Sequence, residues 1–175
     1  SRSKVLCKGS MTMGGGGESS SSSSSSEEGG GNFLTSNGRY NIEGNIFSLY
    51  YGDNFIGQTN LVENAFYKLV KEDTYIVSAE NLSLPSTTLA SGCYQSMFEG
   101  CTSLTTAPQL PATTLASYCY NGMFYQCTSL TTAPSTLPVT TLANYCYDDM
   151  FNGCTSLTTA PELPATTLTE GCYQY

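Results

Sequence analysis

LPATTLASYCYNGMFYQCTSLTTAP, which runs from Leu110 to Pro134, is one complete copy of the unit that fills most of this chain. Its octapeptide CTSLTTAP occurs three times, and the first cysteines of the copies are 26 and 27 residues apart. Self-similarity at a fixed period of about 20 to 50 residues is the sequence signature of repeat architectures. The sequence therefore predicts stacked repeats that share one core. The recurring positions form two cysteine columns and one leucine column: Cys93, Cys119, Cys146 and Cys172; Cys101, Cys127 and Cys154; Leu104, Leu130 and Leu157.

An apolar stripe inside each unit predicts a helix. Leu115, Cys119 and Met123 are spaced four residues apart, a spacing typical of one helix face. We expect this helix over 114–126, with corresponding helices in the neighbouring units. The SLTTAP segment that follows supplies a short strand, which ends at a proline because proline lacks the N–H that a strand ladder needs. The expected fold class is an α/β repeat solenoid of the leucine-rich-repeat type, with one helix and one short strand per unit.

Two segments at the start of the chain have compositions of their own. Residues 1–13 contain three cations, Arg2, Lys4 and Lys8, and we expect them to form an arm that anchors the protein to a partner. Residues 14–32 consist mainly of glycine, serine and glutamate. Such a tract has too little apolar surface to offset the entropy of the chain and is typical of a flexible linker.

The remaining chain divides into a lead-in and the repeats. Residues 33–64 include a stretch in which apolar and polar side chains alternate, and they predict two short strands that seal the end of the first repeat. We place the repeats at 65–175. The last unit contains only the first half of the pattern, and an uncapped apolar end is unusual in repeat proteins. We therefore expect that repeats continue beyond Tyr175 or that a partner covers this end.

Charge is distributed unevenly along the chain. The formal net charge is −8, and all six Lys and Arg residues lie at or before Lys71. Nucleic-acid binding would need a basic face, so we exclude nucleic acid as a ligand of the repeats. No apolar run approaches the ~20 residues of a membrane-spanning helix, and no secretory signal is visible. We expect no cofactor.

Seven of the eight cysteines, those of the two columns, are interpreted as buried structural thiols. On the expected helix, Cys119 and Cys127 would lie about 12 Å apart, whereas a disulfide needs Cα atoms within ~7 Å. The chain contains no histidine and no C-x-x-C pair, which argues against a zinc site. A reduced cysteine behaves as a small buried apolar side chain. Cys7 lies outside the repeat pattern and is not assigned a role.

The sequence predicts a binding protein rather than an enzyme. Without histidine, no Ser/His or Cys/His nucleophile arrangement is possible, and we expect neither catalytic nor metal-binding residues. Positions that vary between copies of the unit are the candidates for contact with a ligand, because packing does not fix them. Tyrosines in a polar setting suit glycan or protein contact. The candidate contact residues are Tyr118, Tyr125, Tyr145, Asp148 and Asp149.

GCTSLTTAPELPATTL, from Gly153 to Leu168, resembles the repeat of the BspA-type leucine-rich-repeat proteins. The resemblance covers roughly 60–175 and is most specific to the variant found in surface proteins of Bacteroidetes and in structural proteins of their crAss-like phages. NIFSLYYGDNF, from Asn45 to Phe55, is similar to the lead-in of such arrays. The resemblance implies a right-handed leucine-rich-repeat solenoid, and a role in surface adhesion or as a virion appendage. It implies no catalytic residues.

Two functions remain open. The first is a phage virion protein, a head or tail fibre or decoration, in which residues 1–32 bind other virion proteins and the repeats are displayed for adhesion. The order of arm, linker and repeats favours it, and so do reduced cysteines, which suit assembly in a bacterial cytosol. The second is a bacterial cell-surface adhesin that binds host protein or glycan. In either case we expect a homo-oligomer.

Overall fold

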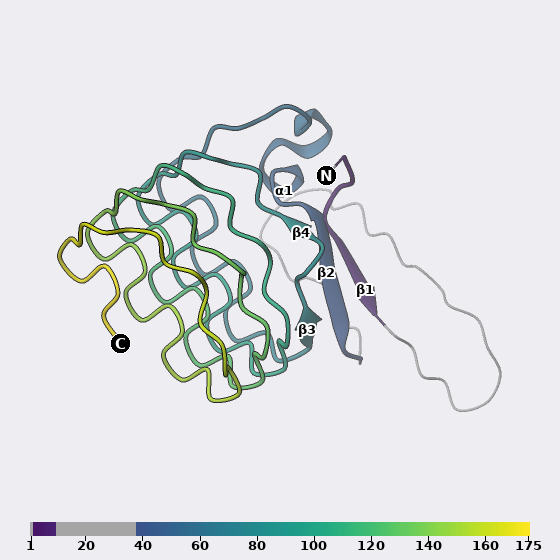
Figure 1. Ribbon diagram of the computed structural model, residues 1–175. Helices are drawn as coiled ribbons and strands as arrows, with labels where there is room; N and C mark the ends of the chain where they lie inside the picture. Colours follow the sequence, from purple (N-terminus) through teal and green to yellow (C-terminus); the bar gives the residue numbers. More distant parts are fainter. Residues whose placement is uncertain (1, 10–37) are drawn as a thin grey trace.

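The computed structural model describes residues 2–9 and 38–175, in which successive coils of the chain lie side by side and form one stack (Figure 1). Regular elements are confined to the N-terminal end of the stack, where a small sheet and two short helices precede or belong to the first coil. The elements are β1 (Leu6–Gly9), β2 (Tyr40–Asn45), α1 (Ser48–Tyr51), the 3-10 helix η1 (Gly52–Asn54), β3 (Ile76–Ser78) and β4 (Leu82–Ser83).

The prediction of one helix and one strand per repeat is wrong. In the described part of the chain, the helices are α1 and η1, and both precede the repeats. The stretch 114–126, expected as a helix, contains no helix and is instead built largely from consecutive turns. The expected repeat strands are reduced to isolated bridges between neighbouring coils.

Each coil contains a series of consecutive turns, which we call a turn run. The backbone N–H groups along a turn run alternate between two kinds of hydrogen-bond acceptor. The Cys93 N–H donates to the Ala90 carbonyl within the same coil (3.3 Å), and the next N–H, of Tyr94, donates to the Cys119 carbonyl of the following coil (3.0 Å). The same alternation continues along the run and recurs in the neighbouring coils. Each coil is therefore a series of overlapping β-turns whose remaining N–H groups bind it to the next coil.

The turns require a positive φ at every fourth residue. In one coil, Gly92, Ser96 and Gly100 have φ of 61°, 54° and 72°. Each is the third residue of a turn closed by an i to i+3 hydrogen bond, which is the position where a type II turn needs φ above zero. The corresponding residues of the other coils are Asn64, Lys68 and Glu72; Tyr118, Gly122 and Gln126; Tyr145, Asp149 and Gly153; Gly171 and Tyr175.

This four-residue period explains why the sequence resembled a helix. Two neighbouring side chains point into the coil and the next two point out, so that Cys119 and Tyr120 are buried while Tyr125 and Gln126 reach the surface. An α-helix has 3.6 residues per turn, so side chains at intervals of four drift by about 40° per step. A stripe that keeps to intervals of four therefore fits the turn run better than a helix.

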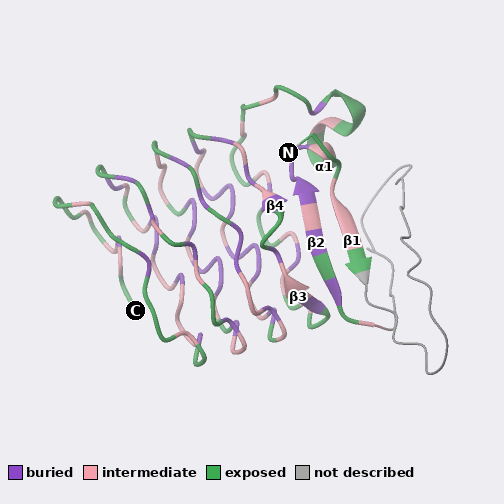
Figure 2. Ribbon diagram, turned by 45° about the vertical axis from the view of Figure 1, so that its right-hand side comes forward, coloured by how far each residue is buried: buried purple, intermediate pink, exposed green. Residues whose placement is uncertain are grey.

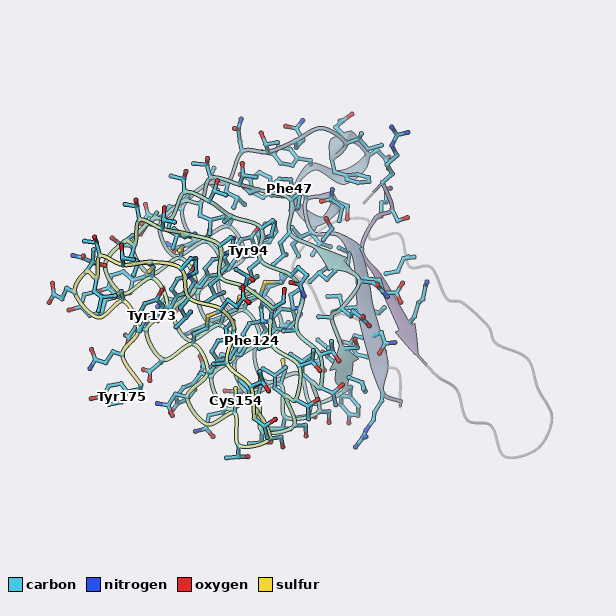
Figure 3. All side chains as sticks on the ribbon, in the orientation of Figure 1. Phe47, Tyr94, Phe124, Cys154, Tyr173 and Tyr175 are labelled. Carbon is cyan, nitrogen blue, oxygen red and sulfur yellow. The ribbon has the colours of Figure 1, made fainter. Side chains whose placement is uncertain are left out.

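Identical side chains stack on one another through the core, which Figure 2 shows as buried segments on the inner sides of the coils. The rings of Tyr94, Tyr120 and Tyr147 are 5.7 Å apart and nearly parallel. Figure 3 shows Phe47, Tyr94 and Tyr173 along this column. A second column contains Phe98, Phe124 and Phe151, with spacings of 5.6 and 5.7 Å. Each coil thus covers the apolar rings of its neighbour, which no coil could bury alone.

The other sides of the coils are joined by parallel bridges between threonines. Thr106 bridges Thr132 on one side, and Thr88 bridges Thr114 on another. Hydroxyl groups support these sides, since the Thr131 hydroxyl donates to the Thr105 carbonyl of the preceding coil (3.2 Å). The repeated TT pairs therefore hold neighbouring coils together.

The described part of the lead-in, 38–64, contains one strand, whereas two were expected over 33–64. Strand β2 runs parallel to β3 and β4 and antiparallel to β1, with Cys7 opposite Ile42. The stretch after β2, predicted as a second strand, is helix α1. Its N-cap Phe47 stacks on Phe66 of the first turn run, with ring centroids 6.2 Å apart. No helix within residues 2–9 and 38–175 is long and apolar enough to cross a membrane.

Candidate functional site

The three complete copies of the unit differ mainly on one side of the coil. Aligned over 84–108, 110–134 and 137–161, they are identical except at seven positions per copy. Six of these lie in the turn run, and the seventh is the buried position of Ser86, Ala112 and Val139. We call the outward-pointing side chains of the turn runs the turn face. The six variable positions of the turn run are the outward pairs of that face: 91–92, 95–96 and 99–100 in the first copy, 117–118, 121–122 and 125–126 in the second, and 144–145, 148–149 and 152–153 in the third.

All five candidate contact residues lie on the turn face. Tyr118 and Tyr145 occupy the same position in neighbouring coils, and their rings stack with centroids 5.0 Å apart and planes within 5°. Tyr118 is 40% exposed. The Tyr145 hydroxyl donates to the Glu170 carboxylate (2.6 Å), and this hydrogen bond raises the pKa of Tyr145 to about 12. The two rings thus form a stacked pair, which Glu170 of the following coil holds from the C-terminal side.

Glycines make room for the side chains of the preceding coil. A Cβ added at Gly171, whose φ is 61°, would lie 2.3 Å from the Cδ1 atom of Tyr145. A Cβ at Gly92 would lie 2.2 Å from the Asn64 side-chain oxygen. Both contacts are far closer than atoms approach, so Asn64 and Tyr145 each require glycine at the same position of the next coil. The turn face is therefore a set of side chains that lean toward the C-terminal end.

A ladder of polar side chains runs beside the tyrosines. The Gln95 amide donates to the side-chain oxygen of Asn121 (3.0 Å), and the Asn121 amide donates to the Asp148 carboxylate (3.0 Å). Burial, and next the charge of Asp149, raises the pKa of Asp148. Asp149 itself accepts a hydrogen bond from the Asn152 amide (2.7 Å). The ladder fixes the amides in place and leaves part of their hydrogen-bonding capacity toward solvent.

Tyr125 and the neighbouring ion pair belong to the third pair of positions. Tyr125 is half-buried on the turn face and its carbonyl accepts the Gly100 N–H (2.8 Å). In the preceding coil Glu99 occupies the same position and pairs with Lys71 at 3.0 Å. Because Lys71 is the last cation of the chain, the later coils present only neutral and acidic groups on this face.

The described part of the expected arm packs against the stack. Residues of β1 pair with β2, and two of the three arm cations make ion pairs: Lys4 with Asp53, and Lys8 with Glu43 at 2.8 Å. Arg2 is exposed. Residues 10–37, which include the rest of the arm and the expected linker, lie outside the described residues. Anchoring by the arm stays a prediction.

The repeat cysteines are free, buried thiols, and those of one column donate hydrogen bonds to the preceding coil. The Cys127 thiol donates to the Phe98 carbonyl (3.1 Å), and Cys101 and Cys154 make the equivalent bonds to Val70 (3.2 Å) and Phe124 (3.1 Å). Burial raises the pKa of Cys101 to about 12, so its thiol stays protonated at neutral pH. The other column, Cys93, Cys119, Cys146 and Cys172, is buried as well, as are Leu104 and Leu130, whereas Leu157 is half-buried.

The structure offers little for small-molecule chemistry. Within the described residues, no group of three or more Cys, Asp or Glu side chains could hold a metal ion. A shallow cavity of about 120 Å³ lies at the last coils, lined mainly by apolar side chains such as Met150 and Tyr173. Ligand pockets usually measure about 300–1,000 Å³ and carry convergent polar groups, so this cavity does not resemble one.

Sequence reasoning missed Asn64, Gln95 and Asn121 as members of the face. Comparison of the copies position by position was the available signal for Gln95 and Asn121, since both vary. Asn64 belongs to the degenerate first coil, where the apolar pattern of 65–70 aligns it with Gly92, and both residues have a positive φ.

No protein-family model, curated protein or solved structure matches this chain. The resemblance of the repeats to BspA-type proteins therefore stays a prediction.

Proposed function

We propose that this chain is a non-catalytic recognition module that binds its target through the turn face. The observation that supports this most is the distribution of differences between the copies of the unit. Six of the seven positions that differ are outward pairs of the turn face, whereas the buried apolar side chains of the turn runs are the same in all three copies. Close packing between the stacked coils restricts which side chains the core positions can hold. The outward pairs are under less packing constraint and can adapt to a ligand.

The chemistry of the turn face suits recognition of a polar surface. Stacked tyrosines supply rigid contact area, and the adjacent amides and carboxylates supply hydrogen bonds. The scaffold beneath is held by hydrogen bonds between coils, so little conformational entropy is lost on binding. Similar groups recur from coil to coil, which gives avidity for a target that is itself repetitive.

We infer that the module is displayed on a phage virion, with residues 1–32 directed toward other virion proteins. The order of the basic arm, the Gly/Ser-rich tract and the repeats supports this, together with the resemblance of the repeat to virion and surface proteins. Lys4 and Lys8 are already paired, so we place the anchoring contact at strand β1. Among the described strands β1 pairs only with β2, and a partner strand can extend a sheet at such an edge. Homo-oligomerisation stays a prediction.

Display on a bacterial cell surface is the second candidate, supported by the same repeats. Gold-labelled antibodies against the repeats separate the two, because they would decorate purified phage particles in one case and cell envelopes in the other.

Blocking one side of the coil at a time tests the binding proposal. The purified chain is labelled and bound to Bacteroidetes cells, and two matched variants are compared with it. Ser117→Lys with Asn144→Lys places two long cations on the turn face, and Thr113→Lys with Thr140→Lys places them on an exposed threonine side. We expect the first variant to lose binding and the second to retain it. Equal loss in both, or loss only in the second, would contradict the proposal.

A further inference from the structure

We propose that the turn face carries a subsite for one neutral sugar ring, formed by the open face of Tyr118 and the carboxamides of Asn64 and Gln95. The inference rests on the proposed function, since it names the ligand class of the same face.

The first support is the environment of the Tyr118 ring. One face of the ring stacks on Tyr145, and among the described residues it stacks with no other ring. In the preceding coil the same position of the column is Gly92, which has no side chain to cover the second face. Tyr118 is accordingly 40% exposed. One face of the ring is therefore supported by Tyr145 and the other lies toward a glycine, as a stacking platform requires.

The second support is the position of two carboxamides at the glycine. The Asn64 side-chain oxygen and the Gln95 side-chain oxygen would lie 2.2 and 3.3 Å from a Cβ added at Gly92. Both groups therefore reach the gap that the glycine leaves in front of Tyr118. Gln95 also donates through its amide to Asn121, which fixes its orientation. Asn64 makes no side-chain hydrogen bond with the described residues and is exposed.

These groups match the two kinds of surface on a sugar. The C–H groups of a pyranose face pack on an aromatic ring, which buries apolar area on both sides. Hydroxyl groups both donate and accept, and a carboxamide offers both functions. The column lacks one side chain in front of the ring, that of Gly92, so the proposed subsite takes a single sugar ring rather than the larger apolar anchor that dominates protein interfaces.

Charge favours a neutral sugar over an acidic one. From Leu84 to Tyr175 the chain contains five carboxylates and no cation. Of the first coil's cations, Lys71 is paired with Glu99, and Lys68 lies over the Tyr67 ring at 4.8 Å. An anionic sugar would meet unpaired acids without a basic partner and would be repelled.

A surface of immobilised neutral oligosaccharides tests the subsite with the full chain. The probes are glucose-, galactose-, mannose- and xylose-based oligosaccharides, with sialylated and uronic-acid oligosaccharides beside them. The main variant is Tyr118→Gly, which installs the residue that Gly92 and Gly171 already supply in this column and so preserves the turn. Tyr118→Phe retains the ring, and Tyr125→Gly removes a tyrosine elsewhere on the turn face.

We expect binding to at least one neutral series, a loss of at least tenfold with Tyr118→Gly, and retention with Tyr118→Phe and Tyr125→Gly. Gln95→Ala should weaken binding as well. Binding confined to the acidic sugars, equal loss with Tyr125→Gly, or binding to no sugar would overturn the subsite. If the lysine variants of the turn face still lose binding to cells in that case, the recognition proposal stands and a protein target replaces the glycan. If they do not, both proposals fail.

Discussion

Gly and Ala substitutions at Gln126 and at its neighbour Tyr125 should affect stability in opposite senses. Gln126 has φ of 61° and is exposed, with no side-chain hydrogen bond to the described residues, whereas Tyr125 has no positive φ. In the preceding coil Gly100 occupies the position of Gln126 with φ of 72°. Gln126→Gly and Gln126→Ala remove nearly the same side chain and differ only in whether a Cβ remains on a left-handed residue.

The expected difference follows from two opposing costs. An L-residue in the left-handed region loses roughly 1–2 kcal/mol, and glycine avoids this cost. Glycine in turn loses about 0.5–1 kcal/mol more backbone entropy on folding than alanine. At Gln126 the Gly variant should therefore be more stable than the Ala variant by about 0.5–1 kcal/mol. At Tyr125 only the entropy term applies, so the Ala variant should be more stable by a similar amount.

Urea unfolding of the four variants measures both differences, and thermal unfolding gives a second estimate. A change of 1 kcal/mol shifts the Tm of a chain of this size by about 2–4 °C. A helix over 114–126 would make Ala more stable than Gly at both positions, by about 1 kcal/mol each. That result would refute the turn architecture.

Three further predictions concern the core and the columns. Tyr94→Phe should leave stability unchanged or raise it by about 1 kcal/mol in urea unfolding, because the buried Tyr94 hydroxyl has no partner among the described residues and leaving a buried donor unpaired is costly; a loss above 1 kcal/mol would show that the hydroxyl is bonded. Gly171→Ala should destabilise by about 1–3 kcal/mol through its φ and its contact with Tyr145, and Tyr145→Ala in the same chain should recover part of the loss; a fully additive double variant would sink that explanation. Burial raises the pKa of Cys93 and Cys101 from 9.0 to about 12, so the folded state holds these protons more tightly and stability should fall as pH rises from about 9 toward 12; a Tm that is constant between pH 8 and 11 would contradict it.

The sequence indicated the repeat but not the conformation of its backbone. Whole octapeptides recur unchanged, so the columns and the stacking of like side chains could be read directly. Over Leu115, Cys119 and Met123, however, a four-residue interval and a 3.6-residue helix differ by only about 40° per step, and short stripes do not separate them. Gly122 lies within that stretch and would cost a helix about 1 kcal/mol. It is the residue that favoured a turn.

The candidate contact residues were found for a physical reason that also limited the search. Tyr118, Tyr145, Asp148 and Asp149 lie at positions that differ between copies, and outward positions of a stacked repeat tolerate differences more readily than buried ones do. Asn64 lies in the degenerate first coil, where the sequence no longer aligns by identity. The apolar pattern of 65–70 aligns Asn64 with Gly92, and the positive φ of both residues agrees with that alignment, but a polar residue in a divergent copy does not stand out as a contact residue.

The four-residue backbone period is the claim from which the turn face, its glycines and the sugar subsite all follow, and one NMR experiment measures it directly. A residue with positive φ near 55–60° brings its own amide and α protons unusually close. In the backbone-assigned chain we predict strong intraresidue HN–Hα cross-peaks at Tyr145 and Asp149, where φ is 56° and 54°, and weak ones at the residues between them. Weak intraresidue peaks throughout 143–153, with continuous contacts between successive amide protons and between residues four apart, would show a helix and contradict the account.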